Sequence, residues 1–174
     1  MTEHIQDLLA TVKNGNGGDV WEAAKELSSL ATDLAASLIA LLQAERAETR
    51  AAAAYVLGFG RFSSARTSLE EVLDNMEEES SVRGHAAEAL AYIQARESAD
   101  VLLKHLWDVN PGVTYWCTFA LGQIRDVKAI PALKHLAERI GEQRYEKYSL
   151  RAEALDAIAE ISQRPRTATV DEET

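Results

Sequence analysis

The chain has 174 residues, of which 47% are hydrophobic, so it is long enough to bury a continuous core as a single domain. Its 18 basic and 28 acidic side chains give a net charge of -10. This charge argues against nucleic acid and anionic membranes as partners, because both attract basic protein surfaces.

The first predicted element is a capping helix over residues 1–15, because apolar side chains recur there at helical spacing. These side chains are Ile5, Leu8, Leu9 and Val12. Residues 14–18 are rich in glycine and asparagine and end the pattern. The N-terminus lacks a signal-peptide pattern and no apolar segment is long enough to cross a bilayer, which predicts a cytoplasmic protein.

From residue 19 the pattern predicts two kinds of helix in alternation, which we call A helices and B helices. The A helices are expected over 19–30, 47–58, 80–94, 112–123 and 147–162, and the B helices over 33–45, 64–76, 97–108 and 127–140. Four A helices share a pattern of small residues followed by an aliphatic anchor. The anchors are Leu57, Leu90, Leu121 and Ile158, spaced 33, 31 and 37 residues apart. Gly58 and Gly122 follow two anchors and are expected to end their helices.

Repetition at this period is typical of stacked helical hairpins, because a single hairpin cannot bury its apolar face alone. The sequence therefore predicts an all-α fold, a right-handed α-solenoid of about five hairpins that forms one domain over residues 1–162. Residues 163–174 are expected to be a disordered tail. Cys117 is the one cysteine and falls at a small core position, which favours a structural thiol in a reducing compartment.

The net charge is unevenly distributed. Residues 1–80 contain 6 basic and 14 acidic side chains, a net charge of -8, whereas residues 81–174 contain 12 and 14, a net charge of -2. A basic partner would be steered towards the N-terminal half. The alternative is that the acid only keeps the surface soluble.

A polar row is predicted on the B helices. His105 and His135 occupy the same position in two of them, Glu71 occupies it in a third, and helical phase turns all three away from the core. The candidate partner-contact residues around the row are Glu70, Asp74, Asp108 and Glu138. Adjacent helices lie about 10 Å apart, too far for joint metal ligation, so we expect no metal site. A solvated polar row and a partner-contact row both remain open.

Aromatic residues cluster on one A helix. Tyr115, Trp116 and Phe119 point away from the B helix and either anchor a partner or pack laterally against Tyr55 and Tyr145. Residues 141–148, which include Arg144 and Tyr145, form either a recognition loop or a helix extension with solvated charges. No nucleophile-base pair, phosphate-binding glycine loop or nucleotide fingerprint is present, so we expect neither catalysis nor a cofactor.

Residues 115–133 read YWCTFALGQIRDVKAIPAL. This segment resembles the HEAT-like repeat of the phycobilisome-lyase type, and the resemblance covers about residues 20–160. It implies that the A helices are convex and that the B helices line a concave groove. It also implies a polar ladder between repeats from Arg50, Arg83 and Arg151, weakened where Thr114 replaces the arginine.

The favoured hypothesis is a non-enzymatic protein-binding scaffold that recognises a basic protein partner, with an immunity protein that neutralises a toxin domain as one specific form. The resemblance suggests a bilin-lyase-like, chromophore-handling protein as the alternative. A DNA glycosylase built from similar repeats is less favoured, because it needs a basic groove.

Overall fold

The computed structural model describes residues 2–30 and 34–163. Its helices are α1 (Glu3–Asn14), α2 (Gly18–Ser29), α3 (Ala35–Leu41), α4 (Ala47–Phe59), α5 (Arg66–Asp74), α6 (Ser80–Tyr92), α7 (Ala99–Lys104), α8 (Pro111–Ile124), α9 (Ile130–Arg139) and α10 (Leu150–Ser162). Two short strands, β1 (Arg144–Tyr145) and β2 (Tyr148–Ser149), form an antiparallel hairpin before α10.

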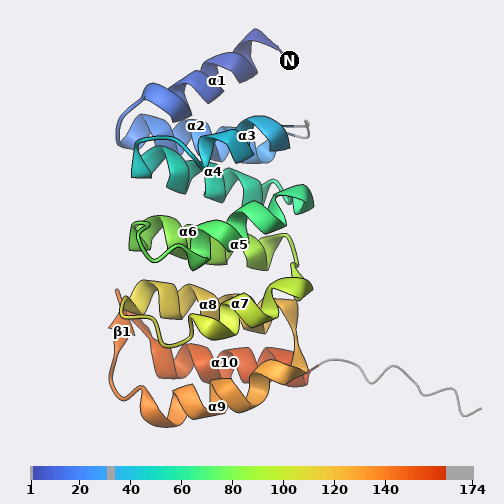
Figure 1. The fold of residues 1–174 in the computed structure, drawn as a ribbon, viewed down its shortest axis with the longest axis vertical. Helices are drawn as coiled ribbons and strands as arrows, with labels where there is room; N and C mark the ends of the chain where they lie inside the picture. Colours follow the sequence, from blue (N-terminus) through green and yellow to red (C-terminus); the bar gives the residue numbers. More distant parts are fainter. Residues whose placement is uncertain (1, 31–33, 164–174) are drawn as a thin grey trace, which may run out of the picture.

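The helices form one elongated stack with α1 at one end and α9 and α10 at the other (Figure 1). The A helices α2, α4, α6, α8 and α10 pack one against the next along the stack. Each B helix, α3, α5, α7 or α9, packs against the A helix that follows it, and α1 packs against α2 in the same way. Within the described residues the stack therefore contains five helical hairpins, as the repeat period predicts, with α1 serving as the B helix of the first hairpin.

The A helices agree with the predicted bounds to within two residues, apart from the last. That helix begins at Leu150, three residues late, because the hairpin of β1 and β2 precedes it. The B helices start late because 3₁₀ turns over residues 63–65, 96–98 and 127–129 come before α5, α7 and α9. Pro131 consequently lies in the first turn of α9, where no backbone N–H is needed.

The core runs through the whole stack. The anchors Leu57, Leu90 and Leu121 are fully buried in this core. Ile158, on α10, is only half-buried. Cys117 is buried as a free thiol, and burial raises its pKa well above the ordinary value, which agrees with a structural thiol.

The two glycines that follow anchors do not end helices as predicted. Gly58 and Gly122 lie inside α4 and α8, and the left-handed residues that follow these helices are Arg61 and Arg125, with φ of 57° and 56°. A Cβ on Gly58 would lie 2.6 Å from Ala89 Cα, and one on Gly122 would lie 2.9 Å from Ala157 Cα. Each glycine therefore allows close approach of the next A helix.

Gly58→Ala should destabilise the protein by about 1–3 kcal/mol, even though alanine is the better helix former, because α4 and α6 must move apart. Chemical denaturation of this variant and of Gly18→Ala measures the effect. Gly18 meets no atom within 4 Å, so its substitution is the matched control. An unchanged or raised stability of Gly58→Ala would contradict the close packing of α4 on α6.

Among the described residues, no helix combines the length and the apolar character that crossing a membrane requires.

Candidate functional site

Donors at the start of the A helices bind the backbone oxygens at the ends of the B helices. Thr49 Oγ1 donates to the oxygen of Val12 at 3.1 Å, and Arg50 Nη1 donates to the oxygen of Ala44 at 2.8 Å. Arg83 Nε donates to the oxygen of Leu73 at 3.2 Å. The last carbonyls of a helix lack partners within it, so these bonds satisfy groups that would otherwise need water.

Two of these arginines also bind a carboxylate from the next loop. Arg50 holds Glu78 through two bonds, Nε to Oε2 at 2.7 Å and Nη2 to Oε1 at 2.6 Å. Arg83 Nη2 donates to Asp108 Oδ2, and both of these side chains are almost fully buried. The predicted polar ladder is confirmed for these two arginines.

The other two positions of the ladder differ. Thr114 replaces the arginine and donates its hydroxyl to the backbone oxygen of Asp108 at 3.3 Å. Arg151 is exposed and makes no ion pair or side-chain hydrogen bond with the described residues, so its place in the ladder stays a prediction. It lies in α10, the last described A helix.

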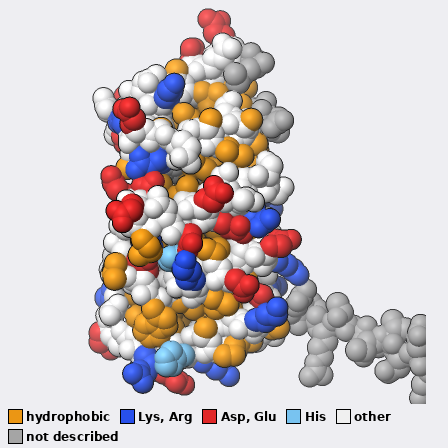
Figure 2. Space-filling view, in the orientation of Figure 1, with side chains coloured by type: hydrophobic (Ala, Val, Ile, Leu, Met, Phe, Trp, Pro, Cys, Tyr) orange, Lys and Arg blue, Asp and Glu red, His pale blue; other side chains and the backbone are white. Residues whose placement is uncertain are grey.

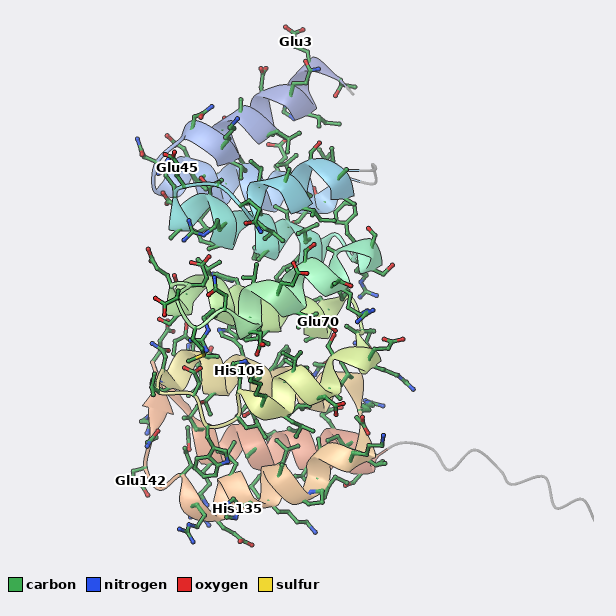
Figure 3. All side chains as sticks on the ribbon, viewed as in Figure 1. Glu3, Glu45, Glu70, His105, His135 and Glu142 are labelled. Atoms are coloured by element: carbon green, nitrogen blue, oxygen red, sulfur yellow. The ribbon has the colours of Figure 1, made fainter. Side chains whose placement is uncertain are left out.

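His105 does not face solvent as predicted; its side chain is 5% exposed and lies inside the stack (Figure 3). Its Nε2 is 2.8 Å from Asp74 Oδ1, and its Nδ1 is 3.7 Å from Asp108 Oδ2. The prediction fails because α7 ends at Lys104, so helical phase no longer sets the direction of His105. Asp108 was also expected on the surface and is buried by its pairing with Arg83.

The other predicted row residues remain near the surface. Glu71, His135 and Glu138 are exposed, and the ring of His135 lies 5.6 Å from that of Trp107. Glu70 is half-buried and accepts from Arg66 at 2.8 Å and from Ser98 at 2.6 Å. The structure therefore brings together His105, Asp74 and Asp108, but not His105 and His135.

Asp74 links two B helices. Its Oδ1 accepts from Lys104 Nζ at 2.6 Å as well as contacting His105, and these bonds hold the pKa of Asp74 below its ordinary value of 3.8. A carboxyl with a lowered pKa in the folded state stabilises the fold while it is ionised. The stabilisation by ionised Asp74 is complete at a pH above the ordinary pKa of the carboxyl. It is lost as the pH falls through the lowered pKa of the folded state.

We expect Asp74→Asn to be less stable than the wild type at pH 7, and the difference to vanish in acid below the lowered pKa. Because Asp74 is partly exposed, the difference should be about 1 kcal/mol or less. Urea unfolding at a series of pH values measures it. A difference that stays constant down to the acid limit would show that ionisation of Asp74 does not stabilise the fold.

The aromatic cluster on α8 belongs to a row that runs along the A helices. The row contains Trp21, Tyr55, Phe59, Tyr92, Phe119, Trp116, Tyr115, Tyr145 and Tyr148, with neighbouring ring centroids 4.3–6.2 Å apart. Tyr115 is buried against Tyr145 and Tyr148. This burial is the main reason why the pKa of the Tyr115 hydroxyl lies far above its usual range. Lateral packing is therefore confirmed for Tyr115, whereas a partner contact by the half-buried Trp116 and Phe119 stays a prediction.

Residues 141–148 contain the first half of the hairpin and are not a helix extension. Arg144 pairs with Ser149 and Tyr145 pairs with Tyr148 across the hairpin, and Arg144 Nη2 donates to the oxygen of Lys147 at 2.6 Å. Tyr145 is half-buried against α8, while Arg144 is exposed. The geometry of the hairpin does not test whether this segment recognises a partner, so that role stays a prediction.

The B helices, with the loops that follow them, form what we call the B face. Acidic side chains gather over its middle in Figure 2, and hydrophobic side chains reach the surface near the end that carries His135. The exposed hydrophobic residues of the B-to-A loops are Met76, Trp107 and Val109. Sequence reasoning did not single them out: Met76 and Trp107 fall at the ends of the predicted helices 64–76 and 97–108, whereas α5 ends at Asp74 and α7 at Lys104.

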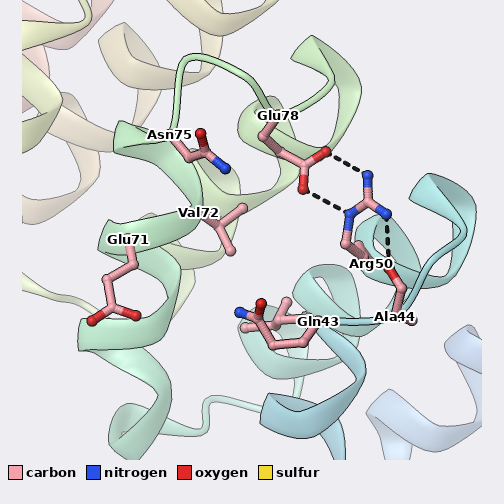
Figure 4. Close-up of a pocket in the computed structure, with 8 residues that line it drawn as sticks. Gln43, Ala44, Arg50, Glu71, Val72, Asn75 and Glu78 are labelled. Atoms are coloured by element: carbon pink, nitrogen blue, oxygen red, sulfur yellow. Dashed lines mark hydrogen bonds and ion pairs between the residues drawn. The ribbon is translucent and has the colours of Figure 1, made fainter.

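A cavity of about 340 Å³ opens on the B face between α3 and α5 (Figure 4). Its lining is Leu42, Gln43, Ala44, Arg50, Glu71, Val72, Asn75 and Glu78. Burial opposes ionisation of Glu78, but the bonds from Arg50 and from the Glu79 amide outweigh it and hold the pKa of this carboxyl below its usual range. The sequence singled out Glu71 in this set, while the pairing of Arg50 with Glu78 needed the three-dimensional stack.

The described residues contain no group of three or more His, Cys, Asp or Glu side chains placed to hold a metal ion.

Comparison with known proteins supports the repeat architecture. Residues 67–146 match a family model of HEAT repeats. Deoxyhypusine hydroxylase-B of Oryza sativa subsp. japonica is 34% identical over 100 residues, which are 58% of this chain and 33% of that protein. The chain thus spans about a third of the length of that relative.

Solved structures show the same fold. A structure of the complex of CpcE and CpcF of phycocyanin lyase from Nostoc sp. PCC7120 superimposes with a TM-score of 0.73 and 19% identity, covering 88% of this chain and 96% of that one. An engineered protein gives a TM-score of 0.59 and 22% identity, covering 92% and 80%. At these identities the similarity concerns the fold alone.

Proposed function

Because this chain is a stack of HEAT-like repeats, we propose that it works as a non-enzymatic scaffold that binds a basic protein partner. Stacked helical repeats present extended surfaces that suit protein recognition. The exposed B face, with its hydrophobic loop residues flanked by charge, has the mixed character of a protein interface. We place this scaffold in the cytoplasm, since its one thiol is free and buried.

The observation that carries the proposal is a group of exposed carboxylates without internal partners. Glu71 on α5 and Glu77 and Glu79 in the loop after it are exposed, and none forms an ion pair with the residues that the structure describes. By contrast, Glu70, Asp74 and Glu78 are neutralised by neighbouring cations or hydrogen bonds. We call Glu71, Glu77 and Glu79 the free acids.

The free acids suit a basic partner for a simple reason. Charges that are exposed in the free protein and meet opposite charges in a complex accelerate encounter and select against acidic partners. They lie in the half of the chain that carries a net charge of -8. An immunity protein that blocks a basic toxin domain is the specific form of this scaffold that fits its size and charge.

Affinity capture from a native lysate, with quantification against a tag-only control, tests the proposal. We expect the enriched proteins to have higher isoelectric points than the lysate average. Their recovery should fall in the acidic-half variant, Glu71→Gln/Glu77→Gln/Glu79→Gln. It should persist in a control variant, Glu97→Gln/Asp100→Asn/Glu142→Gln, which neutralises three exposed acids of the second half. Enriched proteins of average charge that bind both variants equally would refute a basic partner.

A second candidate is a chromophore-handling function. The structural similarity to the CpcE–CpcF complex of phycocyanin lyase favours it, although the shared identity is 19%. A bilin bound by the protein should acquire a changed visible absorption spectrum when the two are mixed and the unbound pigment is removed. A protein fraction that stays colourless would count against this function and would leave the scaffold proposal intact.

A further inference from the structure

We propose that the cavity between α3 and α5 receives an arginine side chain of the basic partner, with Glu71 as its carboxylate ligand. This inference rests on the proposed function and names the point on the B face where the partner is held. Three observations support it: the available hydrogen-bond acceptors around the cavity, the negative electrostatic potential in it, and its apolar floor.

The rim of the cavity carries oxygen acceptors that the fold leaves available. Figure 4 shows Glu71, Gln43 and Asn75 around one opening, with the pair of Arg50 and Glu78 on the opposite side. The side chains of Glu71 and Gln43 make no hydrogen bond within the described part of the chain. The side-chain oxygen of Asn75 accepts from the Glu77 amide at 3.1 Å and keeps a second lone pair.

The electrostatic potential in the cavity favours binding of a cation. Arg50 contributes little net charge because it is held by both oxygens of Glu78, which leaves Glu71 as the uncompensated charge of the lining. Leu42 and Asn75 are the residues at the C-terminal ends of α3 and α5, so two helix ends with negative partial charge meet at the cavity.

The floor of the cavity suits the aliphatic part of a long basic side chain. Leu42 and Val72 lie beneath the polar rim and are buried from solvent in the stack. Arginine and lysine both bury their methylene stems on apolar surface while the charged head stays with polar groups. The cavity therefore offers separate surfaces for the stem and for the head.

The distribution of acceptors favours arginine over lysine. Glu71 lies on α5, Asn75 follows the end of α5 and Gln43 follows the end of α3, so their oxygens approach a ligand from different sides. A planar guanidinium carries five donors that reach separate acceptors at once, whereas an ammonium acts as a compact point charge. The protein already holds a guanidinium in this region, since Arg50 binds both Glu78 and the carbonyls of Ala44 and Glu45.

Titration of the isotope-labelled protein with N-acetyl-arginine amide, followed by two-dimensional NMR, tests the assignment. We expect saturable shifts of the backbone amides of residues 42–45 and 71–78. Glu71→Gln should weaken the apparent affinity about ten-fold, because a charge-assisted hydrogen bond is lost. Glu97→Gln, in the 3₁₀ turn before α7, is the matched control and should bind like the wild type. Because Glu71 and Glu97 are both exposed, both variants should unfold like the wild type.

Three outcomes would overturn the assignment. These are an absence of site-specific shifts, equal binding of the uncharged N-acetyl-citrulline amide, or an unchanged affinity in Glu71→Gln. Equal binding of N-acetyl-lysine amide would overturn the choice of arginine. If the arginine probe fails while capture of basic proteins persists and depends on the free acids, the cavity assignment falls and the proposed function stands.

Discussion

Asp108→Asn should lower the free energy of unfolding by about 3–5 kcal/mol, because it leaves the buried Arg83 guanidinium without its counter-charge. The side chains of Arg83 and Asp108 are 4% and 1% exposed, so water cannot replace the lost carboxylate. His105 lies beside the same guanidinium and can add no negative charge. The loss of stability is therefore the free-energy cost of burying the Arg83 cation without a counter-charge.

Denaturant unfolding of Asp108→Asn against the wild type measures this effect, and two controls define its origin. The double variant Arg83→Met/Asp108→Leu should lose much less stability, because it removes both charges. Glu160→Gln breaks the exposed pair with Arg125 and should cost about 1 kcal/mol or less. If Asp108→Asn costs no more than Glu160→Gln, the pair is not buried in solution.

Leu90→Ala should cost about 2–5 kcal/mol, because it opens a cavity in the middle of the stack. Leu90 is fully buried on α6, which packs against both α4 and α8. Loss of its side chain therefore leaves a cavity in a central repeat, which has a neighbouring repeat on each side.

The matched control for Leu90→Ala is Leu155→Ala on α10, since Leu155 is 52% exposed. We expect its unfolding curve to stay close to that of the wild type. Thermal and denaturant unfolding of both variants give the comparison. Similar losses at the two leucines would mean that the A-helix register assigned to the repeat is wrong.

The repeat pattern was sufficient to predict the A helices, because their anchors must face the neighbouring repeats in every unit. Leu57, Leu90 and Leu121 consequently lie where the 33- and 31-residue spacings place them. The hairpin before α10 was not predicted, because a two-residue strand pair is too short to show an alternating pattern. It forms where Tyr145 and Tyr148 pack on Tyr115.

The candidate site was less predictable than the fold. Helical phase placed Glu71 and His135 correctly on the exposed side, but it failed for His105, which follows the end of α7. The pairs of Arg50 with Glu78 and Arg83 with Asp108 join residues 28 and 25 positions apart. Their signal in the sequence is an acid shortly before each A helix, which becomes interpretable only once the stacking of the repeats is known.

The central claim is that the acidic half of the B face binds a basic protein. Isothermal titration calorimetry of the captured partner at a series of salt concentrations tests it most directly, using the wild type and the acidic-half and control variants. We predict that wild-type affinity falls as salt rises, because exposed charges are screened. The acidic-half variant should bind weakly and with little salt dependence, while the control variant follows the wild type. Affinity that is independent of salt and equal in all three proteins would contradict the claim.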